Sequence, residues 1–246
     1  MFFTYSQLAV VSKDNLFVFT HALNCFNDWS LATTRQIPVL DNCQVAWTTS
    51  GLLITAGAKL CVWDVDALCN SLVSGPAAMF DLPAHPSQIR LSSDDKYLAI
   101  LSGEKMPLLR IVQLHYTAGE QGLHSSCWTL QYHMIILDSP AVHFSWKPAP
   151  PTCTGDRSNS AIVTTVNGQH YIVTEMPKYG RNGCIDRFAT KFIHSNSSLC
   201  GSLAWWSLDD KSRVFFNPSD KLDPYIWDLR AFPGGVNSIT YIESSL

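Results

Sequence analysis

The most regular pattern in this sequence is a set of three short apolar runs between residues 44 and 65. Ser50-Gly51 separates the first run from the second, and Gly57-Ala58-Lys59 separates the second from the third. Short runs rich in β-branched and aromatic residues and bounded by glycine are typical of β-strands. The third run ends in Val62-Trp63-Asp64-Val65. The segment is therefore predicted to fold as three consecutive antiparallel strands.

Nearly the same pattern returns from Gln88 to Ser102, about 44 residues further along the chain. A period of about 40–45 residues with four strands per unit is typical of a β-propeller blade, and a third strand that ends in Trp-Asp is typical of a WD repeat. The sequence predicts an all-β, WD40-like β-propeller, either partial or built from five to six degenerate four-stranded blades.

The whole chain, residues 1–246, is interpreted as one propeller region. The N-terminal hairpin shows no clear first strand, and Val236–Tyr241 has the pattern of the first strand of a further blade. We therefore expect an N-terminal fragment of a longer propeller. The expected blades cover about 1–40, 44–82, 88–137, 141–194 and 200–232, with the start of a further blade at 236–246.

Four residues occupy structural WD positions in this interpretation: Trp63, Asp64, Trp227 and Asp228. In a regular WD repeat, a loop His, a strand Ser or Thr, the Trp and a turn Asp form a hydrogen-bonded set. Here the set is incomplete, since Leu40-Asp41-Asn42 precedes one blade and Val112-Gln113 ends another. We expect Trp63 and Trp227 to be buried packing residues on third strands.

Composition and charge argue against nucleic-acid binding, a disulfide framework and a membrane span. Charged residues make up 15% of the 246 residues and the net charge is −3, so no basic surface for nucleic acid is expected. The eight cysteines form no C-x-x-C pair, which favours reduced thiols over a disulfide framework. No apolar stretch reaches the length of a membrane span, so membrane association is expected only through partners.

No catalytic motif, cofactor site or metal-binding cluster is evident, and we expect no enzyme activity. Asp94-Asp95 and Asp209-Asp210 are adjacent carboxylates, but both pairs fall at predicted strand turns, where Asp caps its own backbone. His143 and His170 fall in predicted strands, where a hydrogen-bonded or solvent-facing His is expected rather than a metal ligand.

The candidate partner-binding surface is one rim of the propeller, formed by loops between second and third strands and between blades. One ring of Trp205-Trp206 is a further candidate interface anchor. The proline-containing insert Lys147–Asn159 is expected to be exposed and open to proteolysis at Arg157. The candidate rim residues are Lys13, His85, Lys105, Met106 and Lys221.

Three stretches resemble the N-terminal propeller of DmX-like proteins, also called rabconnectin-3 alpha, whose yeast counterpart belongs to the RAVE complex. They are Leu8–Phe19, Val45–Trp63, and Pro140–Lys147 followed by a proline-containing insert and Ser160–Thr165. The resemblance covers roughly residues 7 to 175.

The resemblance implies a role in assembling the vacuolar-type proton pump (V-ATPase) and in vesicle acidification. It also implies pump subunits and a rabconnectin-3 beta-like WD protein as partners, and a cytoplasmic protein placed peripherally on vesicles or endosomes. The alternatives are a WD scaffold of a ubiquitin-ligase, trafficking or nuclear complex, and a propeller enzyme with a site in its central channel. The oligomeric state is left open by the sequence.

Overall fold

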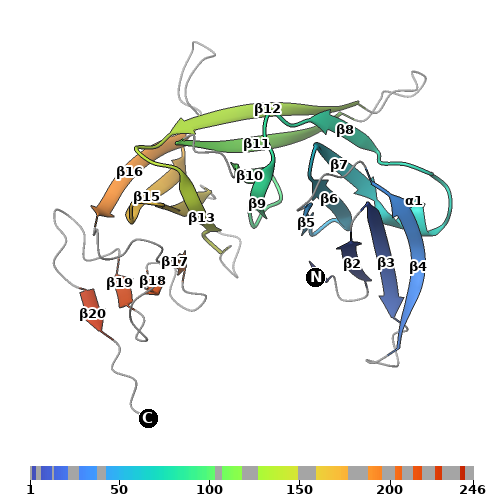
Figure 1. Ribbon diagram of the computed structural model, residues 1–246, viewed down its shortest axis with the longest axis horizontal. Coiled ribbons are helices and arrows are strands. Elements are labelled where there is room, and N and C mark those ends of the chain that lie inside the picture. Colours follow the sequence, from blue (N-terminus) through green and yellow to red (C-terminus); the bar gives the residue numbers. More distant parts are fainter. Residues whose placement is uncertain are drawn as a thin grey trace. The chain divides into compact units, whose positions relative to one another are not determined.

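In the computed structural model, the described strands form five four-stranded sheets, each with its strands hydrogen-bonded in chain order (Figure 1). Every strand pair for which the register is given is antiparallel. The structure describes residues 2–3, 7–12, 14–21, 28–37, 43–102, 107–117, 127–148, 159–176, 188–195, 203–206, 213–217, 225–228 and 239–241. Side chains are described in 7–12, 14–21, 28–37, 43–102, 107–115, 128–148, 159–176 and 188–192.

The first two sheets contain the strands of the N-terminal part. Sheet one consists of β1 (Phe2–Phe3), β2 (Gln7–Ser12), β3 (Asn15–His21) and β4 (Trp29–Gln36). Sheet two consists of β5 (Gln44–Trp47), β6 (Leu52–Ala56), β7 (Lys59–Asp64) and β8 (Ala78–Asp81). The one helix among the described residues, α1 (Val65–Cys69), follows β7. The described part of the chain contains no helix long and apolar enough to cross a membrane.

The other three sheets follow the same plan. Sheet three consists of β9 (Pro86–Leu91), β10 (Tyr97–Ser102), β11 (Leu108–Thr117) and β12 (Cys127–Ile136). Sheet four consists of β13 (Ala141–Trp146), β14 (Ser160–Thr165), β15 (Gln169–Glu175) and β16 (Phe188–Ser195). Sheet five consists of β17 (Leu203–Trp206), β18 (Arg213–Asn217), β19 (Tyr225–Asp228) and β20 (Ile239–Tyr241).

The turns explain why consecutive strands pair. Gly168 has φ 71°, which lies in the left-handed region that glycine adopts without strain, and with Asn167 it closes the β14–β15 hairpin that Asn-Gly predicts. Gly51, with φ 85°, does the same between β5 and β6. Antiparallel strands joined by such short turns need no crossover helix, which explains why the described residues contain only the short helix α1.

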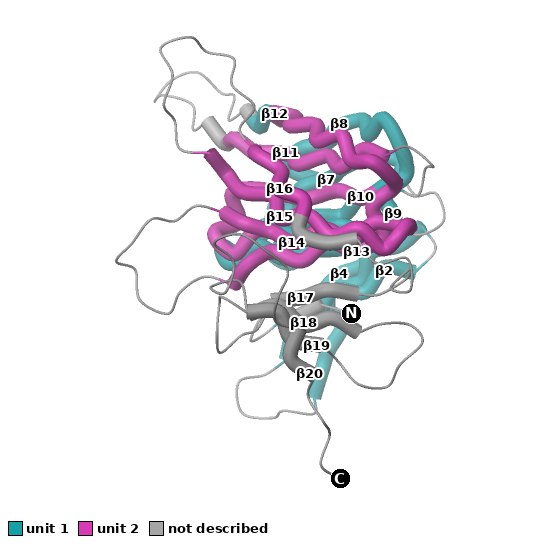
Figure 2. Tube along the Cα trace, turned by 90° about the vertical axis from the view of Figure 1, so that its left-hand side faces the viewer, with its two compact units in different colours: residues 1–91, 102–104, 116–129 teal, residues 92–101, 105–115, 130–246 magenta. Residues whose placement is uncertain are grey.

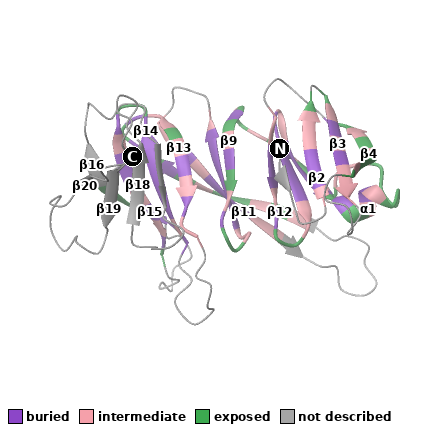
Figure 3. Ribbon diagram, turned by 90° about the horizontal axis from the view of Figure 1, so that it is seen from below, coloured by how far each residue is buried: buried purple, intermediate pink, exposed green. Residues whose placement is uncertain are grey.

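The chain divides into two compact units (Figure 2). Unit 1 comprises residues 1–91, 102–104 and 116–129, and unit 2 comprises residues 92–101, 105–115 and 130–246. Unit 1 has a core in which Leu16, Val18, Leu53 and Trp63 pack together. Unit 2 has a core in which aromatic residues of four strands, β10, β13, β15 and β16, pack with aliphatic residues of β10, β11 and β14. Among the described residues, most of the buried side chains lie on strands (Figure 3).

Sheet one differs from the next three sheets in how its two faces are buried. On one face Ala9 and Val18 are buried in the unit 1 core. On the other face Phe17 and Phe19 are only partly buried and Leu31 is exposed. Sheets two, three and four carry fully buried residues on both faces. Adjacent residues on one strand show this in each sheet: Leu53 and Ile54 on β6, Leu98 and Ala99 on β10, and Ile162 and Val163 on β14.

The structure differs from the expected blade plan at both ends of the chain. The first sheet does have a first strand, Phe2–Phe3, which pairs with Leu8 and Ala9. At the other end, Ile239–Tyr241 does not begin a sixth sheet but pairs with Tyr225–Trp227 as the outermost strand of sheet five. The alternating pattern of a first strand and of a last strand is the same, so the sequence could not distinguish the two positions.

Candidate functional site

Trp63 lies on β7 in the unit 1 core, and its side chain has an exposed fraction of 1%. Its indole Nε1 donates a hydrogen bond to Thr55 Oγ1 on β6 at 3.0 Å. A buried indole nitrogen needs such an acceptor, because an unpaired buried donor is costly. The Trp–Thr half of a WD hydrogen-bonded set is therefore present in sheet two.

Asp64 has a different role from the turn Asp of a regular WD repeat. It is exposed, and its Oδ1 accepts a hydrogen bond from the Ala67 backbone N–H at 2.9 Å, so it caps the N-terminus of α1. Leu40-Asp41-Asn42, where the loop His was sought, lies outside the described residues. Trp227 and Asp228 lie on β19, the third strand of sheet five, and their side chains are outside the described part of the chain.

In sheets three and four the Trp-Asp pattern is replaced by other residues. His170 on β15 is buried, and its Nδ1 forms a hydrogen bond with Thr164 Oγ1 on β14 at 3.1 Å. Of the two expectations for this residue, a hydrogen-bonded or a solvent-facing histidine, the structure shows the first, with Thr164 as its partner. In sheet three Gln113 occupies the position of the WD aspartate; it is buried, and its Oε1 has no hydrogen-bond partner.

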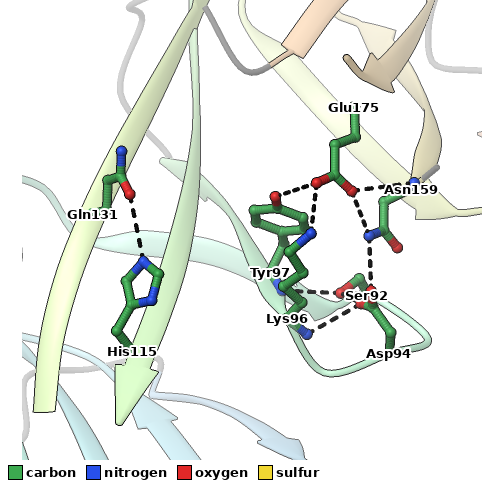
Figure 4. A network of polar contacts seen from close by, with 8 residues as sticks. All are labelled: Ser92, Asp94, Lys96, Tyr97, His115, Gln131, Asn159 and Glu175. Carbon is green, nitrogen blue, oxygen red and sulfur yellow. Dashed lines mark hydrogen bonds and ion pairs between the residues drawn. The ribbon is translucent and has the colours of Figure 1, made fainter. Parts of the chain in front are cut away.

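A network of charged and polar side chains in unit 2 joins sheets three and four (Figure 4). Glu175, at the end of β15, is at its centre. Its Oε1 accepts hydrogen bonds from Lys96 Nζ at 2.6 Å and from the Tyr97 hydroxyl at 2.5 Å. Its Oε2 accepts a hydrogen bond from Asn159 Nδ2 at 2.9 Å. Both oxygens of this buried carboxylate are thus occupied.

Asn159 extends the network to the turn between β9 and β10. Its Nδ2 also donates to Asp94 Oδ2 at 2.9 Å, so one amide bridges two carboxylates. Asp94 Oδ1 accepts from Ser92 Oγ at 2.6 Å and from the Lys96 backbone N–H at 3.1 Å. The expectation that Asp94 caps its own turn agrees with these contacts. Asp95 follows with φ 57°, a left-handed value that Asp tolerates better than most residues.

The electrostatics of the network keep both carboxylates charged. Burial by itself would raise the pKa of Glu175, but the hydrogen bonds from Lys96, Tyr97 and Asn159 outweigh it and lower the pKa to about 2. The pKa of Asp94 is also lowered, because the hydrogen bonds from Asn159, Ser92 and Lys96 outweigh its burial. A general acid or base works best with a pKa near the operating pH. The lowered pKa values therefore fit a structural role, in which Glu175 and Asp94 hold sheets three and four together, better than acid–base catalysis.

Sequence reasoning identified Asp94 but missed Glu175, Asn159 and Tyr97. These residues lie in sheet four or at the start of β10, and Glu175 is 79 positions from Lys96. No local pattern marks this pairing, since it depends on how two sheets pack. A single carboxylate at the end of an otherwise uncharged strand is the one feature that could have marked it.

Four of the five candidate rim residues lie outside the described part of the chain: Lys13, Lys105, Met106 and Lys221. His85 is described and is exposed in the connection between β8 and β9. Trp205 and Trp206 lie on β17, with their side chains outside the described part. Of the insert Lys147–Asn159, only Lys147, Pro148 and Asn159 are described, and Arg157 is not.

Within unit 2, the described rim connections are held in place by hydrogen bonds. The Tyr171 hydroxyl donates to Asp138 Oδ2 at 2.7 Å, and burial together with this carboxylate raises the pKa of Tyr171 to about 12. The Val166 backbone N–H donates to the Pro140 carbonyl at 2.9 Å, joining the β14–β15 turn to the connection before β13. The described residues contain no group of three or more His, Cys, Asp or Glu that could hold a metal ion.

We compared the chain with protein-family models, curated proteins and solved structures, and only the solved structures gave matches. No protein-family model matches the chain, and none of the curated proteins matches it. Among solved structures, the β-propeller domain of Cps50 (Swd1) from Myceliophteria thermophila is similar with a TM-score of 0.54 and 10% sequence identity, over 92% of this chain and 68% of that one.

Two further structures give the same result. Sqt1 from Chaetomium thermophilum is similar with a TM-score of 0.54 and 16% identity, over 94% of this chain and 55% of that chain. The WD40 domain of SCAP from fission yeast is similar with a TM-score of 0.53 and 13% identity, over 92% of this chain and 54% of that chain. The chain thus spans between about half and two thirds of these proteins. The predicted fold class, an all-β WD40-like propeller fold, is confirmed.

Proposed function

We propose that this chain is a non-catalytic WD-repeat scaffold that binds other proteins. The proposal rests mainly on one observation: the carboxylates of the network form their hydrogen bonds with other side chains of this chain. Glu175 and Asp94 are held ionised by Lys96, Asn159 and Tyr97, so they serve as a brace between sheets rather than as an acid and a base. A braced β framework that presents loops is a common platform for recognition.

The proposed partner surface is the rim that carries Lys13, His85, Lys105, Met106 and Lys221. Two features of the described residues support this choice. His85 is exposed in a connection between sheets, and the unit 2 connections at Asp138–Pro140 and Val166–Gly168 are tied by hydrogen bonds to the strands beneath them. Fixed loops lose little conformational entropy on binding, which favours affinity.

The more specific proposal is that the partners belong to the vacuolar-type proton pump and its assembly machinery, including a rabconnectin-3 beta-like WD protein. It would place the protein in the cytoplasm, peripherally on vesicles or endosomes. This part rests on the sequence resemblance of residues 7–175 to the N-terminal propeller of DmX-like proteins. A WD scaffold of a ubiquitin-ligase, trafficking or nuclear complex is the alternative, because the fold is common to all of them.

Affinity purification of the tagged full chain from cell extract, followed by mass spectrometry, tests the proposal. Enrichment of proton-pump subunits supports the specific assignment. Enrichment of ligase subunits or nuclear factors supports the alternative scaffold. Absence of any enriched protein, together with turnover of a small molecule by the purified chain, would contradict the scaffold itself.

A pair of variants locates the surface. Lys105→Ser with Met106→Ser, beyond the end of β10, should reduce partner recovery while leaving the circular dichroism spectrum unchanged. Asp95→Asn, in the turn that precedes β10, is the matched control, since it lies at the opposite end of the same strand and Asn also accepts a left-handed φ. Loss of recovery in the control alone would place the surface on the other face.

A further inference from the structure

Three histidines occupy one row across sheet four. His143 on β13 lies opposite Thr164 on β14, and Thr164 lies opposite His170 on β15. On the other side of β15, His194 on β16 lies opposite His170. Directly opposed residues of antiparallel strands share a face, with Cβ atoms about 4.5–5.5 Å apart. The three histidines therefore belong to one face of one sheet, and His170 and His194 are immediate neighbours in the row.

His170 is the fully buried member of this histidine row. Its exposed fraction is 0%, as is that of Thr164, whose hydroxyl forms the 3.1 Å hydrogen bond with Nδ1 of His170. Ile162, two residues before Thr164 on the same face of β14, is buried to the same extent. An added proton would therefore place a charge in the interior of unit 2, and a buried charge is costly unless an opposite charge balances it.

The strands around His170 carry basic residues and no carboxylate. β13, β14 and β16 contain no Asp or Glu, and neither does β17, the strand of sheet five that contacts β13 and β14. The titratable residues of these four strands are His143, Lys191 and His194. Lys191 lies opposite Ile172, which shares the face of His170. A proton on His170 would thus join a row of like charge.

The two carboxylates close to β15 in the fold lie toward the other face of sheet four. Residues alternate along a strand, so Tyr171 and Glu175 lie on the face opposite to His170. Asp138 accepts a hydrogen bond from the Tyr171 hydroxyl, and Glu175 is held in the network with sheet three. Both carboxylates already accept hydrogen bonds on that other face.

We propose that the histidine row is an acid-sensitive latch of the β14–β15 hairpin. Near neutral pH the row is uncharged, and the bond between Thr164 and His170 holds the hairpin closed. Below about pH 6.5, where histidine ordinarily gains a proton, positive charges accumulate on neighbouring strands of one face. Thr164 and His170 are the register pair closest to the turn, so the hairpin opens from Val166–Gly168.

Hydrogen exchange of the purified full chain between about pH 7.5 and pH 5.5 tests the latch. Protection factors divide out the intrinsic pH dependence of amide exchange, so they report the opening of the hairpin itself. Each proton that the open state binds and the closed state lacks should lower the protection of the β14 and β15 amides about tenfold per pH unit. Glu175 does not contribute here, because its pKa of about 2 and its ordinary value of 4.5 both lie below this range.

Replacement of single histidines tests which residues form the latch. His170→Asn can still form a hydrogen bond with Thr164 but cannot take up a proton, so the protection of the same amides should stay nearly constant over the range. His194→Asn should respond less steeply than the wild type, because the row loses one proton site. His85→Asn is the matched control, since His85 is exposed and belongs to unit 1, and it should respond like the wild type.

Nuclear magnetic resonance of the imidazole nitrogens gives a reading on the unaltered chain. His170 should keep the neutral pattern at pH values where His85 is already protonated. Titration of His170 together with His85 in the folded chain would overturn the proposal. So would constant protection of the wild-type hairpin, a His170→Asn chain that loses protection as steeply as the wild type, or an unchanged response in His194→Asn.

Discussion

Lys96 and Glu175 lie 79 positions apart in the chain and form an ion pair with an Nζ–Oε1 distance of 2.6 Å. The Glu175 side chain is 10% exposed, and the ammonium of Lys96 also lies 4.8 Å from the centroid of the Tyr97 ring. The pair joins the turn before β10 to the end of β15, and so ties sheet three to sheet four within unit 2.

Removal of this carboxylate should destabilise the protein. Glu175→Ala leaves Lys96, the Tyr97 hydroxyl and the Asn159 amide without their acceptor, and breaking one partner of a buried ion pair costs about 3 kcal/mol or more. Urea denaturation of the two proteins measures the difference in the free energy of unfolding.

The matched control is Asp81→Ala. Asp81 pairs with Lys59 at 3.3 Å, but its side chain is 88% exposed. Exposed pairs contribute about 0–1 kcal/mol, so this variant should remain close to the wild type. Equal losses in the two variants would show that the Glu175 network does not brace unit 2.

Lowering the pH should reduce the free energy of unfolding, because it protonates the Glu175 carboxylate. In the unfolded chain Glu175 has its ordinary pKa of 4.5, and in the folded protein its pKa is about 2. Between these values the unfolded state binds more protons, so its contribution to stability is fully present above pH 4.5 and is lost as the pH falls toward 2. The lowered pKa of Asp94 acts in the same direction.

Thermal unfolding followed from neutral pH down to the acid range measures this dependence. We expect Glu175→Gln, which cannot ionise, to be less stable at neutral pH and to show a shallower acid limb than the wild type. An acid limb of the same steepness in both proteins would mean that other carboxylates account for it.

The indole of Trp63 should contribute through both its volume and its N–H group. Trp63→Ala removes a fully buried side chain and should cost about 3–5 kcal/mol. Trp63→Phe keeps most of the volume but leaves Thr55 without its donor, which should cost about 1–3 kcal/mol. If Thr55→Val is added to Trp63→Phe, the double variant should be more stable than additivity of the single variants predicts. Additive losses would show that the Trp63–Thr55 bond contributes nothing.

Two thiols of unit 1, those of Cys43 and Cys61, should react slowly in the native protein. Burial raises the pKa of Cys43 to about 11 and also raises that of Cys61, which has almost no exposed surface. Because the thiolate is the reactive form, alkylation at mildly basic pH should be much slower at these two positions than in urea. Peptide mass spectrometry after iodoacetamide treatment reports each site. Rapid modification of native Cys61 would be incompatible with its position in the core.

The fold class could be predicted because it depends on local periodicity. Val62-Trp63-Asp64 and the Asn167-Gly168 turn each mark a strand end or hairpin from a few adjacent residues. The order of the end strands could not be predicted, since Ile239–Tyr241 has the same alternation whether it begins a sheet or completes one. The Glu175 network could not be predicted either, because its partners come from different sheets and meet only after those sheets pack.

Hydrogen exchange of the purified chain, alone and in complex with a partner recovered by affinity purification, tests the central claim most directly. The account predicts that backbone amides in the rim connections, around His85 and between β10 and β11, become protected in the complex. The amides of the Asp94–Lys96 turn at the opposite end of β10 should be unchanged. Protection confined to that turn, or no protection anywhere in the chain, would contradict the proposal that this protein is a scaffold that binds through its rim.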